Sequence, residues 1–343
     1  MDFSLDESQQ AVAELAASVL RTGPDHARAL AAIASEAGYD DATWKAMAQA
    51  GLLALGLPEQ VGGDGLGPLP TALVLREVGG QVLPLPALAT LALGVLPVAA
   101  FGGPAEQSLL AEVAHGRVLT AALRDAPDAP LTWSDGTLHG TRVGVHYAAQ
   151  AYRVLVPTED GLAVIDPRAS GMELKRTSTS TGAPEYTVRL DGVRPESVIE
   201  ATPADVDRFA VAGAAAVADG LISAALALTA EHVRQRRQFG RPLATFQAVA
   251  QEIADVYVVA RTVHLAALSA AWRLDTGRDA DEDLSVAAYW VAAQLPRALQ
   301  VCHHLHGGLG VDITYPLHRY YSHAKDLARF LGGAEYRLER LGS

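Results

Sequence analysis

The chain has 343 residues, of which 50% are hydrophobic, and it carries a formal net charge of −12. This length predicts two or three lobes rather than one compact core. Nucleic-acid binding needs clustered cations, and no long basic run is present, so a nucleic-acid partner is disfavoured. The single cysteine, Cys302, excludes a disulfide framework and a cysteine-based zinc site, and it fits a reducing cytoplasm.

The first 115 residues are predicted to form helices. Ser4 followed by Glu7 resembles a capping box ahead of an apolar-periodic run, and the acidic start lacks the basic region of a signal peptide. The uncharged stretch 83–101 contains three prolines. In lipid, the backbone groups around these prolines would be unsatisfied, so we predict a buried helix of a soluble protein and no membrane span.

Between residues 116 and 202 the pattern changes to short runs rich in valine, threonine and tyrosine. Strands are expected at 138–145, 153–157, 162–166 and 186–190. The turn signals between strands are Ser134-Asp135-Gly136 and Asp191-Gly192. These features predict a small antiparallel β lobe.

Helical periodicity returns after residue 203. A run without proline covers 243–276, and a further helix is expected at 284–305, which carries Pro296. The order of helices, strands and helices predicts an α+β protein of three parts. These parts are an N-terminal helical domain at 1–115, a middle β domain at 116–202 and a C-terminal four-helix bundle at 203–343.

Two constellations in the C-terminal third are candidates for ligand binding. The first covers 234–242 and is followed by Gln247. Gly240 and Pro242 are expected to end one helix and to start the next near Leu243, where free N–H groups and the helix dipole attract anions. Guanidinium groups beside a helix start suit a diphosphate, although a solvated basic cap on a helix C-terminus has the same composition.

The second constellation is His303-His304-Leu305-His306 followed by Gly307-Gly308-Leu309-Gly310. Glycines let a backbone approach a ligand closely and expose its N–H groups. His303 and His306 lie one turn apart, but no carboxylate accompanies them at ligand spacing, so a metal site is disfavoured. The histidines are better interpreted as hydrogen-bond donors near a phosphate or ribose.

Taken together and in this order, the motifs resemble the acyl-CoA dehydrogenase family over nearly the whole chain. The residues that carry the resemblance are Met1-Asp2-Phe3-Ser4-Leu5 with Gln9, Gly51-Leu52-Leu53-Ala54-Leu55-Gly56-Leu57-Pro58-Glu59 with Gly62-Gly63, Leu75-Arg76-Glu77-Val78-Gly79, Arg236-Arg237-Gln238-Phe239-Gly240 with Gln247, and His306-Gly307-Gly308-Leu309-Gly310 with Tyr315-Pro316. The resemblance implies the family's fold and its reaction. In that reaction a carboxylate removes the α proton of an acyl-CoA, and the β hydrogen leaves as a hydride to N5 of FAD.

The resemblance also implies that FAD lies across a subunit interface, with its ring on one subunit and its ADP portion on the neighbour. Carried over by position, the ADP-side contacts of this chain are Arg236, Gln238, Phe239, Gln247, His304, Leu305, Gly307 and Gly308. Gln238 replaces a hydroxyl residue that is frequent in the family, and His304 replaces a glutamine; both keep hydrogen-bonding capacity. Family spacing favours Arg236 as the arginine that faces the cofactor, but the sequence leaves Arg234 and Arg237 open.

The family's catalytic base has no evident counterpart. At one family position of the base the chain carries Leu331, which cannot accept a proton; at the other it carries Ala210. The nearest substitutes are Glu335, four residues beyond Leu331, and Asp207, about one turn before Ala210. The structural alternative for Asp207 is a charge that complements the helix dipole beside Arg208.

The flavin-ring side departs from the family as well. Residues 121–128 replace its Thr-Glu-Pro-Gly-Ser-Asp-like loop, and 143–147 replace its Trp-Ile-Thr/Ser strand. All the losses fall at one end of the cofactor. The sequence therefore favours a non-catalytic subunit of a hetero-oligomeric acyl-CoA dehydrogenase, of α2β2 form, whose homologous partner supplies the base and binds most of the acyl-CoA.

The identity of the substrate and two alternative functions rest on weaker signals in the sequence. Heteromeric dehydrogenases of this style in actinobacteria act on CoA-linked steroid side chains, and a composition with only three lysines fits a high-GC genome. Fold-level association of this kind does not derive a substrate. A flavin-free scaffold subunit and a self-sufficient homotetramer that uses Asp207 or Glu335 stay open.

Overall fold

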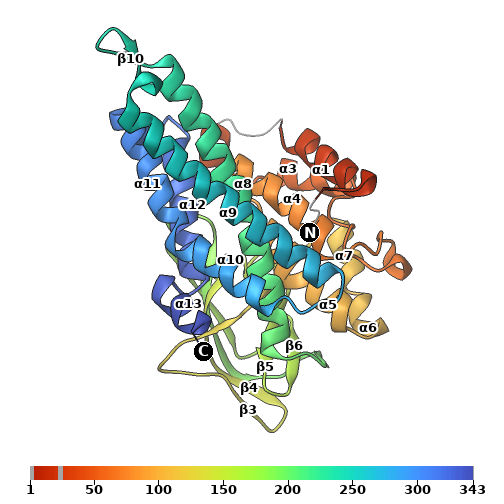
Figure 1. The fold of residues 1–343 in the computed structure, drawn as a ribbon. Helices are drawn as coiled ribbons and strands as arrows, with labels where there is room; N and C mark the ends of the chain where they lie inside the picture. The colour runs from red at the N-terminus through yellow and green to blue at the C-terminus, as the bar shows by residue number, and fades with distance from the viewer. Residues whose placement is uncertain (1–3, 22–25, 343) are drawn as a thin grey trace.

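The computed structural model describes residues 4–21 and 26–342, in which helices come first, then strands, then long helices (Figure 1). This order confirms the predicted α+β class, with an N-terminal helical domain, a middle β domain and a C-terminal helical domain. The opening Met1-Asp2-Phe3 of the resemblance lies outside the described residues.

The N-terminal domain is built from short helices. They are α1 (Glu7–Leu20), α2 (His26–Ala34), α3 (Asp41–Gln49), the 3-10 helix η1 (Glu59–Val61), α4 (Pro68–Gln81), the π-helix η2 (Leu88–Val95), α5 (Leu96–Phe101), α6 (Pro104–Gln107) and α7 (Leu110–Ala114). The predicted cap of α1 is wrong by two residues. Asp6 is the N-cap, its carboxylate accepts the Gln9 N–H at 2.8 Å, and Gln9 accepts the Asp6 N–H in return.

The uncharged stretch 83–101 forms the predicted buried helix from residue 87 onward, while 83–86 are not helical and 100–101 are exposed. η2 and α5 run on from one another, and their side chains pack against β1 (Val118–Ala121) and α8 (Pro203–Gln235). Two longer helices, α8 and α9 (Gln247–Asp275), have the length and composition of membrane spans. Within their apolar windows 72% of α8 but 33% of α9 is buried, so α8 is a core helix and α9 presents apolar surface outward.

The middle domain consists of two small sheets. Its other strands are β2 (Arg124–Asp125), β3 (Thr132–Ser134), β4 (Thr137–His146), β5 (Ala151–Thr158), β6 (Gly161–Ile165), β7 (Met172–Thr177), β8 (Glu185–Val193) and β9 (Ser197–Ile199). One sheet has the order β1-β5-β6-β9, and the other has β2-β4-β8-β7 with β3 on β4. All four predicted strands are present, and their inner faces share one apolar cluster.

Two details of the β domain differ from expectation. The pair β1–β5 is parallel, whereas the other pairs are antiparallel. Asp135 and Gly136, with φ of 51° and 74°, form the predicted hairpin turn between β3 and β4. Asp191 and Gly192 instead lie inside β8, because pairing with β4 and β7 overrides the local turn preference.

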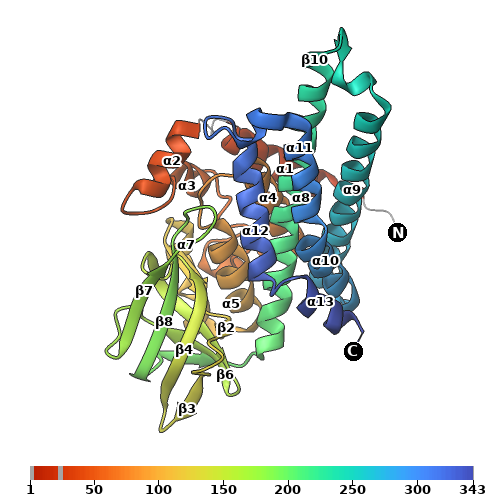
Figure 2. The ribbon, with the colours of Figure 1, turned by 90° about the vertical axis from the view of Figure 1, so that its left-hand side faces the viewer.

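The C-terminal domain packs its helices around α8, which runs the length of the molecule (Figure 2). The other elements are the strands β10 (Arg237–Gln238) and β11 (Arg241–Pro242), the 3-10 helix η3 (Leu243–Thr245), α9, α10 (Asp281–Ala293), α11 (Leu295–His306), the 3-10 helix η4 (Gly307–Val311), α12 (Leu317–Phe330) and α13 (Ala334–Leu341). The close approach of α4 to α8 requires glycine, since a Cβ at Gly220 would collide with the carbonyl of Arg76.

Two predicted helix boundaries are wrong in this domain. The helix expected near Leu243 begins at Gln247, after a hairpin and a 3-10 turn. The helix expected at 284–305 is two helices that meet at Gln294. Pro296 lacks a backbone N–H and sits in the first turn of α11, where no intrahelical donor is needed.

Candidate functional site

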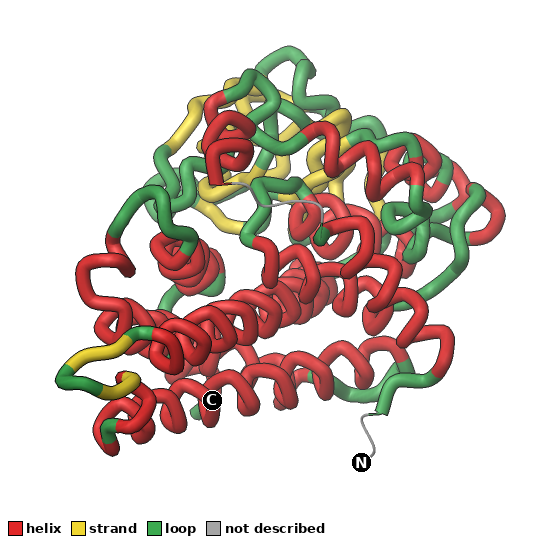
Figure 3. The backbone as a smooth tube through the Cα atoms, turned by 90° about the horizontal axis from the view of Figure 1, so that it is seen from above, coloured by secondary structure: helices red, strands yellow, loops and turns green. Residues whose placement is uncertain are grey.

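A two-stranded hairpin projects from one end of the helical domain, where α8 passes into α9 (Figures 1 and 3). Arg237 pairs with Pro242 and Gln238 with Arg241. Phe239 and Gly240 form the turn, with φ of 50° and 78°. Two-residue hairpin turns that match the right-handed twist of the strands require positive φ at both positions. The Phe239 side chain is 90% exposed, so it is available to another molecule.

The arginines near this hairpin have different surroundings. Arg234 pairs with Glu231 at 3.1 Å, and Arg237 donates to the Gly240 carbonyl at 2.8 Å. Arg241 lies over the ring of Phe246, 4.1 Å from its centroid. Within residues 4–21 and 26–342, the guanidinium of Arg236 makes no hydrogen bond or ion pair. Arg236 is therefore the arginine of this motif that is free to meet an anion.

The glycine loop follows the end of α11 at the same end of the domain. Gly307 has φ of 58° and ψ of −138°, a conformation that suits glycine. A Cβ at Gly307 or Gly308 would meet nothing within 4 Å, so both backbones face open space. His304 is exposed, with Nε2 4.0 Å from the Glu252 carboxylate of α9. Leu305 is buried, so its contact with a ligand would come from its backbone.

Two stacked histidine rings join the arginine motif to the glycine loop. His232, in the last turn of α8, and His306, in the last turn of α11, have ring centroids 4.3 Å apart and planes 19° apart. Nδ1 of His306 donates to the Cys302 carbonyl at 2.8 Å, so Nε2 accepts from the Tyr315 hydroxyl at 3.1 Å.

The same surroundings disfavour protonation of both rings. Burial lowers the pKa of His232, and the charge of Arg236 lowers it further. Burial also lowers the pKa of His306, and His232 and His303 add to this effect, against the Cys302 carbonyl. Nothing in the sequence indicated that His232 would meet His306.

The ring of His303 contacts a different residue from the ring of His306. Its ring packs edge-on against Tyr321 with centroids 5.3 Å apart, while His306 faces His232. In the described part of the chain, no group of three or more His, Cys, Asp or Glu side chains is arranged to hold a metal ion.

The two positions that the resemblance predicts for the family's base are apolar and buried. Leu331 follows α12 with no exposed surface, and its carbonyl accepts from Nε of Arg337 at 2.6 Å. Ala210 is equally buried on α8. Glu335 is exposed in the first turn of α13, after two glycines that turn the chain away from Leu331.

Asp207 is held by two ion pairs. Its carboxylate lies 3.1 Å from Arg124 of β2 and 3.9 Å from Arg337 of α13. The expected neighbour Arg208 instead pairs with Asp281 at 2.7 Å. Asp207 thus ties the β domain to α13, and its contacts are those of a paired anion.

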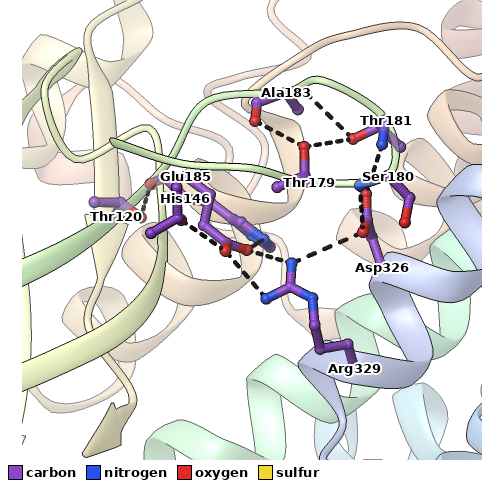
Figure 4. A network of polar contacts seen from close by, with 10 residues as sticks. Thr120, His146, Thr179, Ser180, Thr181, Ala183, Glu185, Asp326 and Arg329 are labelled. Carbon is purple, nitrogen blue, oxygen red and sulfur yellow. Dashed lines mark hydrogen bonds and ion pairs between the residues drawn. The ribbon is translucent and has the colours of Figure 1, made fainter. Parts of the chain in front are cut away.

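The segments that replace the family's ring contacts, 121–128 and 143–147, border one cavity of about 440 Å³. Charged groups line it: Arg124, Glu185 and Arg329. Figure 4 shows Arg329 between Glu185, at 2.6 and 3.0 Å, and Asp326, at 3.8 Å. Arg329 and Glu185 therefore form a paired, charged part of the wall of this cavity.

Glu185 is a buried carboxylate that the sequence did not single out. Burial raises its pKa, but hydrogen bonds from His146 and Arg329 outweigh that effect and lower the pKa to about 2. A carboxylate with so low a pKa is a weak base. Glu185 begins β8, and nothing in the surrounding sequence indicated that its side chain would be buried.

A second, apolar cavity lies on the other side of Phe330. It measures about 100 Å³, and its lining includes the apolar residues Leu83, Leu88, Val217 and Leu327 together with His323 and Asp326. Pockets that bury drug-sized ligands usually enclose roughly 300–1,000 Å³. The cavity is therefore too small for a bulky acyl group as it stands.

Comparison with known proteins agrees with this architecture. Residues 6–117 match the acyl-CoA dehydrogenase N-terminal domain and residues 198–342 the acyl-CoA dehydrogenase C-terminal domain. The chain is 45% identical to acyl-CoA dehydrogenase FadE28 of Mycobacterium tuberculosis, over 100% of this chain and 98% of that protein.

Two solved structures are similar over almost their full length. One is the ChsE4-ChsE5 complex from Mycobacterium tuberculosis, with a TM-score of 0.93, 29% identity and coverage of 100% of this chain and 98% of that one. The other is the Tcur3481-Tcur3483 steroid ACAD G363A variant, with a TM-score of 0.91, 34% identity and coverage of 98% and 97%. From its domains, its motifs and these likenesses, the chain belongs to the acyl-CoA dehydrogenase family, whose members are FAD-dependent oxidoreductases.

Proposed function

We propose that this chain is a non-catalytic subunit of a hetero-oligomeric acyl-CoA dehydrogenase, and that it donates the ADP-side half of an FAD site to a homologous partner. The observation that carries the proposal is a difference between two ends of the molecule: one has groups free to bind a ligand, and the other lacks a base. At the hairpin end, Arg236 is exposed and unpaired within the described chain, beside an open glycine backbone. At the other end, Leu331 and Ala210 are buried where a base belongs.

The hairpin end fits the diphosphate and ribose of FAD. Arg236 offers a charge-assisted donor, and the Gly307-Gly308 backbone can approach closely. Gln238 and Phe239 lie on the hairpin, Gln247 begins α9 and His304 lies in the last turn of α11. Leu305 contributes through its backbone. When bound, FAD supplies the hydride acceptor for an acyl-CoA that the partner holds and deprotonates.

A homologous partner also suits the surface of the C-terminal domain. Tyr257, Val258 and Leu265 of α9 are large exposed apolar side chains, as are Val311 and Ile313 beside the glycine loop. Contiguous apolar surface of this kind marks interaction sites. The similarity to a chain of the ChsE4-ChsE5 complex supports a homologous partner subunit, and we propose an α2β2 form for the assembly.

The substrate is proposed by similarity alone. One neighbour is described as a steroid ACAD, which supports a steroid side-chain CoA thioester as the substrate of the assembled enzyme. The cavity of about 100 Å³ beside Phe330 is consistent with binding of that group by the partner. A cytoplasmic site of action is proposed from the single cysteine.

The visible spectrum separates this proposal from its alternatives. The chain is purified alone and with a homologous partner encoded nearby, and flavin absorbance is recorded for both. Flavin only in the complex supports the shared site, and flavin in neither supports a scaffold subunit. Flavin and acyl-CoA turnover by the lone chain, lost in Asp207→Asn or Glu335→Gln, would establish a self-sufficient enzyme instead.

Arg236→Ala tests the half-site directly. Loss of one charge-assisted diphosphate contact is expected to weaken FAD binding by the complex by about 1.5–3 kcal/mol. The measurement is the FAD dissociation constant by fluorescence titration of the deflavinated complex. Arg234→Ala is the matched control, since Arg234 already pairs with Glu231, and it should leave FAD binding unchanged. Equal affinities in both variants would reject the assignment of Arg236.

A further inference from the structure

The stacked rings of His232 and His306 join the arginine motif to the glycine loop. His232 lies one turn before Arg236, whose backbone N–H donates to the His232 carbonyl at 2.8 Å. His306 directly precedes Gly307, whose backbone faces open space. The pair is therefore flanked in the chain by two of the groups that we propose to meet the diphosphate of FAD. A charge gained by either ring would act on an anion held between those groups.

His306 has hydrogen-bond partners that suit an imidazolium as well as a neutral ring. Its Nδ1 lies 2.8 Å from the Cys302 carbonyl, and its Nε2 lies 3.1 Å from the Tyr315 hydroxyl. A hydroxyl oxygen accepts hydrogen bonds as well as donating them. If Nε2 gains a proton, the Tyr315 hydroxyl can turn and accept it, so neither N–H is left without a partner. This is important because His306 is only 5% exposed, and a buried charge without hydrogen bonds is costly.

In the unliganded chain, the neighbours of the stack oppose this protonation. Burial lowers the pKa of His306, and His232 and His303 lower it further. Burial also lowers the pKa of His232, as does the charge of Arg236. An anion placed beside the stack would reverse this balance, because a nearby opposite charge favours the protonated imidazole. The titratable and charged groups around the stack come from α8, α9, α11 and the segment that leads into α12: Arg236, Glu252, Cys302, His303, His304, Tyr315 and His318.

We propose that His306 takes up a proton when the diphosphate of FAD binds beside Arg236, so that cofactor binding by this subunit is coupled to pH. The proposal rests on the FAD half-site proposed above and adds a means of regulating it. A diphosphate is a dianion near neutral pH, so it offsets the charge of Arg236 and favours the imidazolium. His232 supplies a neutral ring against which the charged ring stacks, with planes 19° apart. The imidazolium in turn attracts the diphosphate.

The coupling has a definite sign. The pKa of His306 is lowered in the free chain, and the bound diphosphate raises it. FAD affinity therefore increases as the pH falls through the pKa of the complex, and it levels off below the pKa of the free chain. A difference of about one pKa unit corresponds to a roughly 10-fold decrease in the FAD dissociation constant between about pH 8 and about pH 5.5.

Three variants separate His306 from the neighbouring histidines. His306→Gln keeps an amide donor for the Cys302 carbonyl and an acceptor for the Tyr315 hydroxyl. Glutamine does not titrate, so this variant should bind FAD with an affinity that does not change with pH. His232→Phe keeps an aromatic ring in the stack and should keep the pH dependence. His304→Gln, at an exposed position of α11, should also keep the pH dependence, whatever its effect on FAD affinity.

The experiment uses the complex of this chain with its partner, from which FAD has been removed. FAD dissociation constants are measured by fluorescence titration between about pH 5.5 and about pH 8. Calorimetric titration with FAD, in buffers of different ionisation enthalpy, measures the protons taken up on binding. The expected result is proton uptake by the parent, by His232→Phe and by His304→Gln, and its loss in His306→Gln.

Absence of proton uptake by the parent, or uptake that survives in His306→Gln or disappears in His232→Phe or His304→Gln, would overturn the proposal. Thermal unfolding checks that His306→Gln is folded. If it is not, uptake by the parent and its retention in the other two variants still test the proposal. The FAD half-site fails on a different result, which is the absence of saturable FAD binding or binding that Arg236→Ala leaves unchanged. Binding that depends on Arg236 but not on pH would overturn the proton uptake alone.

Discussion

At the scale of single residues, Glu185 shows how a buried charge is tolerated. Arg329 contacts both of its carboxylate oxygens, Thr177 donates at 3.1 Å and His146 lies at 3.4 Å. These partners lower the pKa of Glu185 from 4.5 to about 2. Because the folded pKa is depressed, the stabilisation is complete above about pH 4.5 and is lost as the pH falls toward about 2.

Glu185→Gln is therefore expected to lower the free energy of unfolding by roughly 2 kcal/mol at neutral pH, less than the full shift implies, since Arg329 is half-exposed and its charge is screened. The deficit should shrink as the pH falls through about 4 to 3. Urea unfolding of both proteins across this pH range measures it. Glu173→Gln, at an exposed pair on β7, is the control. A deficit that does not change with pH would contradict the assigned ion pair.

At the scale of elements, the hairpin between α8 and α9 has backbone requirements for folding that are distinct from the side chain it offers for binding. The turn needs positive φ at residues 239 and 240, and asparagine adopts this conformation more readily than phenylalanine. The exposed Phe239 ring packs only edge-on against Phe246, with centroids 6.1 Å apart. Its presence at such a position points to a contact with another molecule.

Phe239→Asn should keep the hairpin and leave the free energy of unfolding of the lone chain within about 0.5 kcal/mol of the parent. In the complex, it should reduce FAD retention or partner affinity. Gly240→Val is the contrasting variant: its left-handed backbone should cost about 1–2 kcal/mol and impair folding and binding together. Thermal unfolding of the chain and flavin content of the complex check both. Full flavin content in Phe239→Asn would remove Phe239 from the site.

At the scale of the whole molecule, the distribution of apolar surface predicts an assembly. Only 33% of the apolar window of α9 is buried, against 72% for α8, although the two helices are similar in length and lie side by side (Figures 1 and 2). The outward side of α9 carries Tyr257, Val258 and Leu265.

Val258→Asp is expected to prevent stable assembly, because an aspartate buried in an apolar interface would be unpaired. Size-exclusion chromatography with light scattering, on the chain co-expressed with its partner, measures the change. Val198→Asp, at an exposed apolar residue of β9, is the control and should leave the assembly intact. An unchanged complex in Val258→Asp would exclude α9 as the contact surface.

The sequence alone determined the α+β class, the order of domains and the family, because hydrophobic periodicity and ordered motifs are local or nearly local signals. It placed strands such as 153–157 within a few residues. The absence of a base at Leu331 stays a prediction from the family resemblance. The sequence misplaced the cap at Ser4, the turn at Asp191 and the helix at 284–305, where pairing or a single proline changed the outcome.

Only the tertiary structure decided which charges meet. Arg236 differs from Arg234 and Arg237 because its neighbours leave it unpaired in the described structure, a property that three arginines within four residues of sequence cannot reveal. The stacking of His232 on His306, 74 residues later in the chain, depends on how α8 and α11 pack. Glu185 with Arg329, and Asp207 with Arg124 and Arg337, likewise come from distant segments. Burial and ion pairing depend on three-dimensional proximity, and these physical quantities distinguish the exposed hairpin end of this chain, where we propose that the cofactor binds, from the ion-paired end around Asp207 and Glu185.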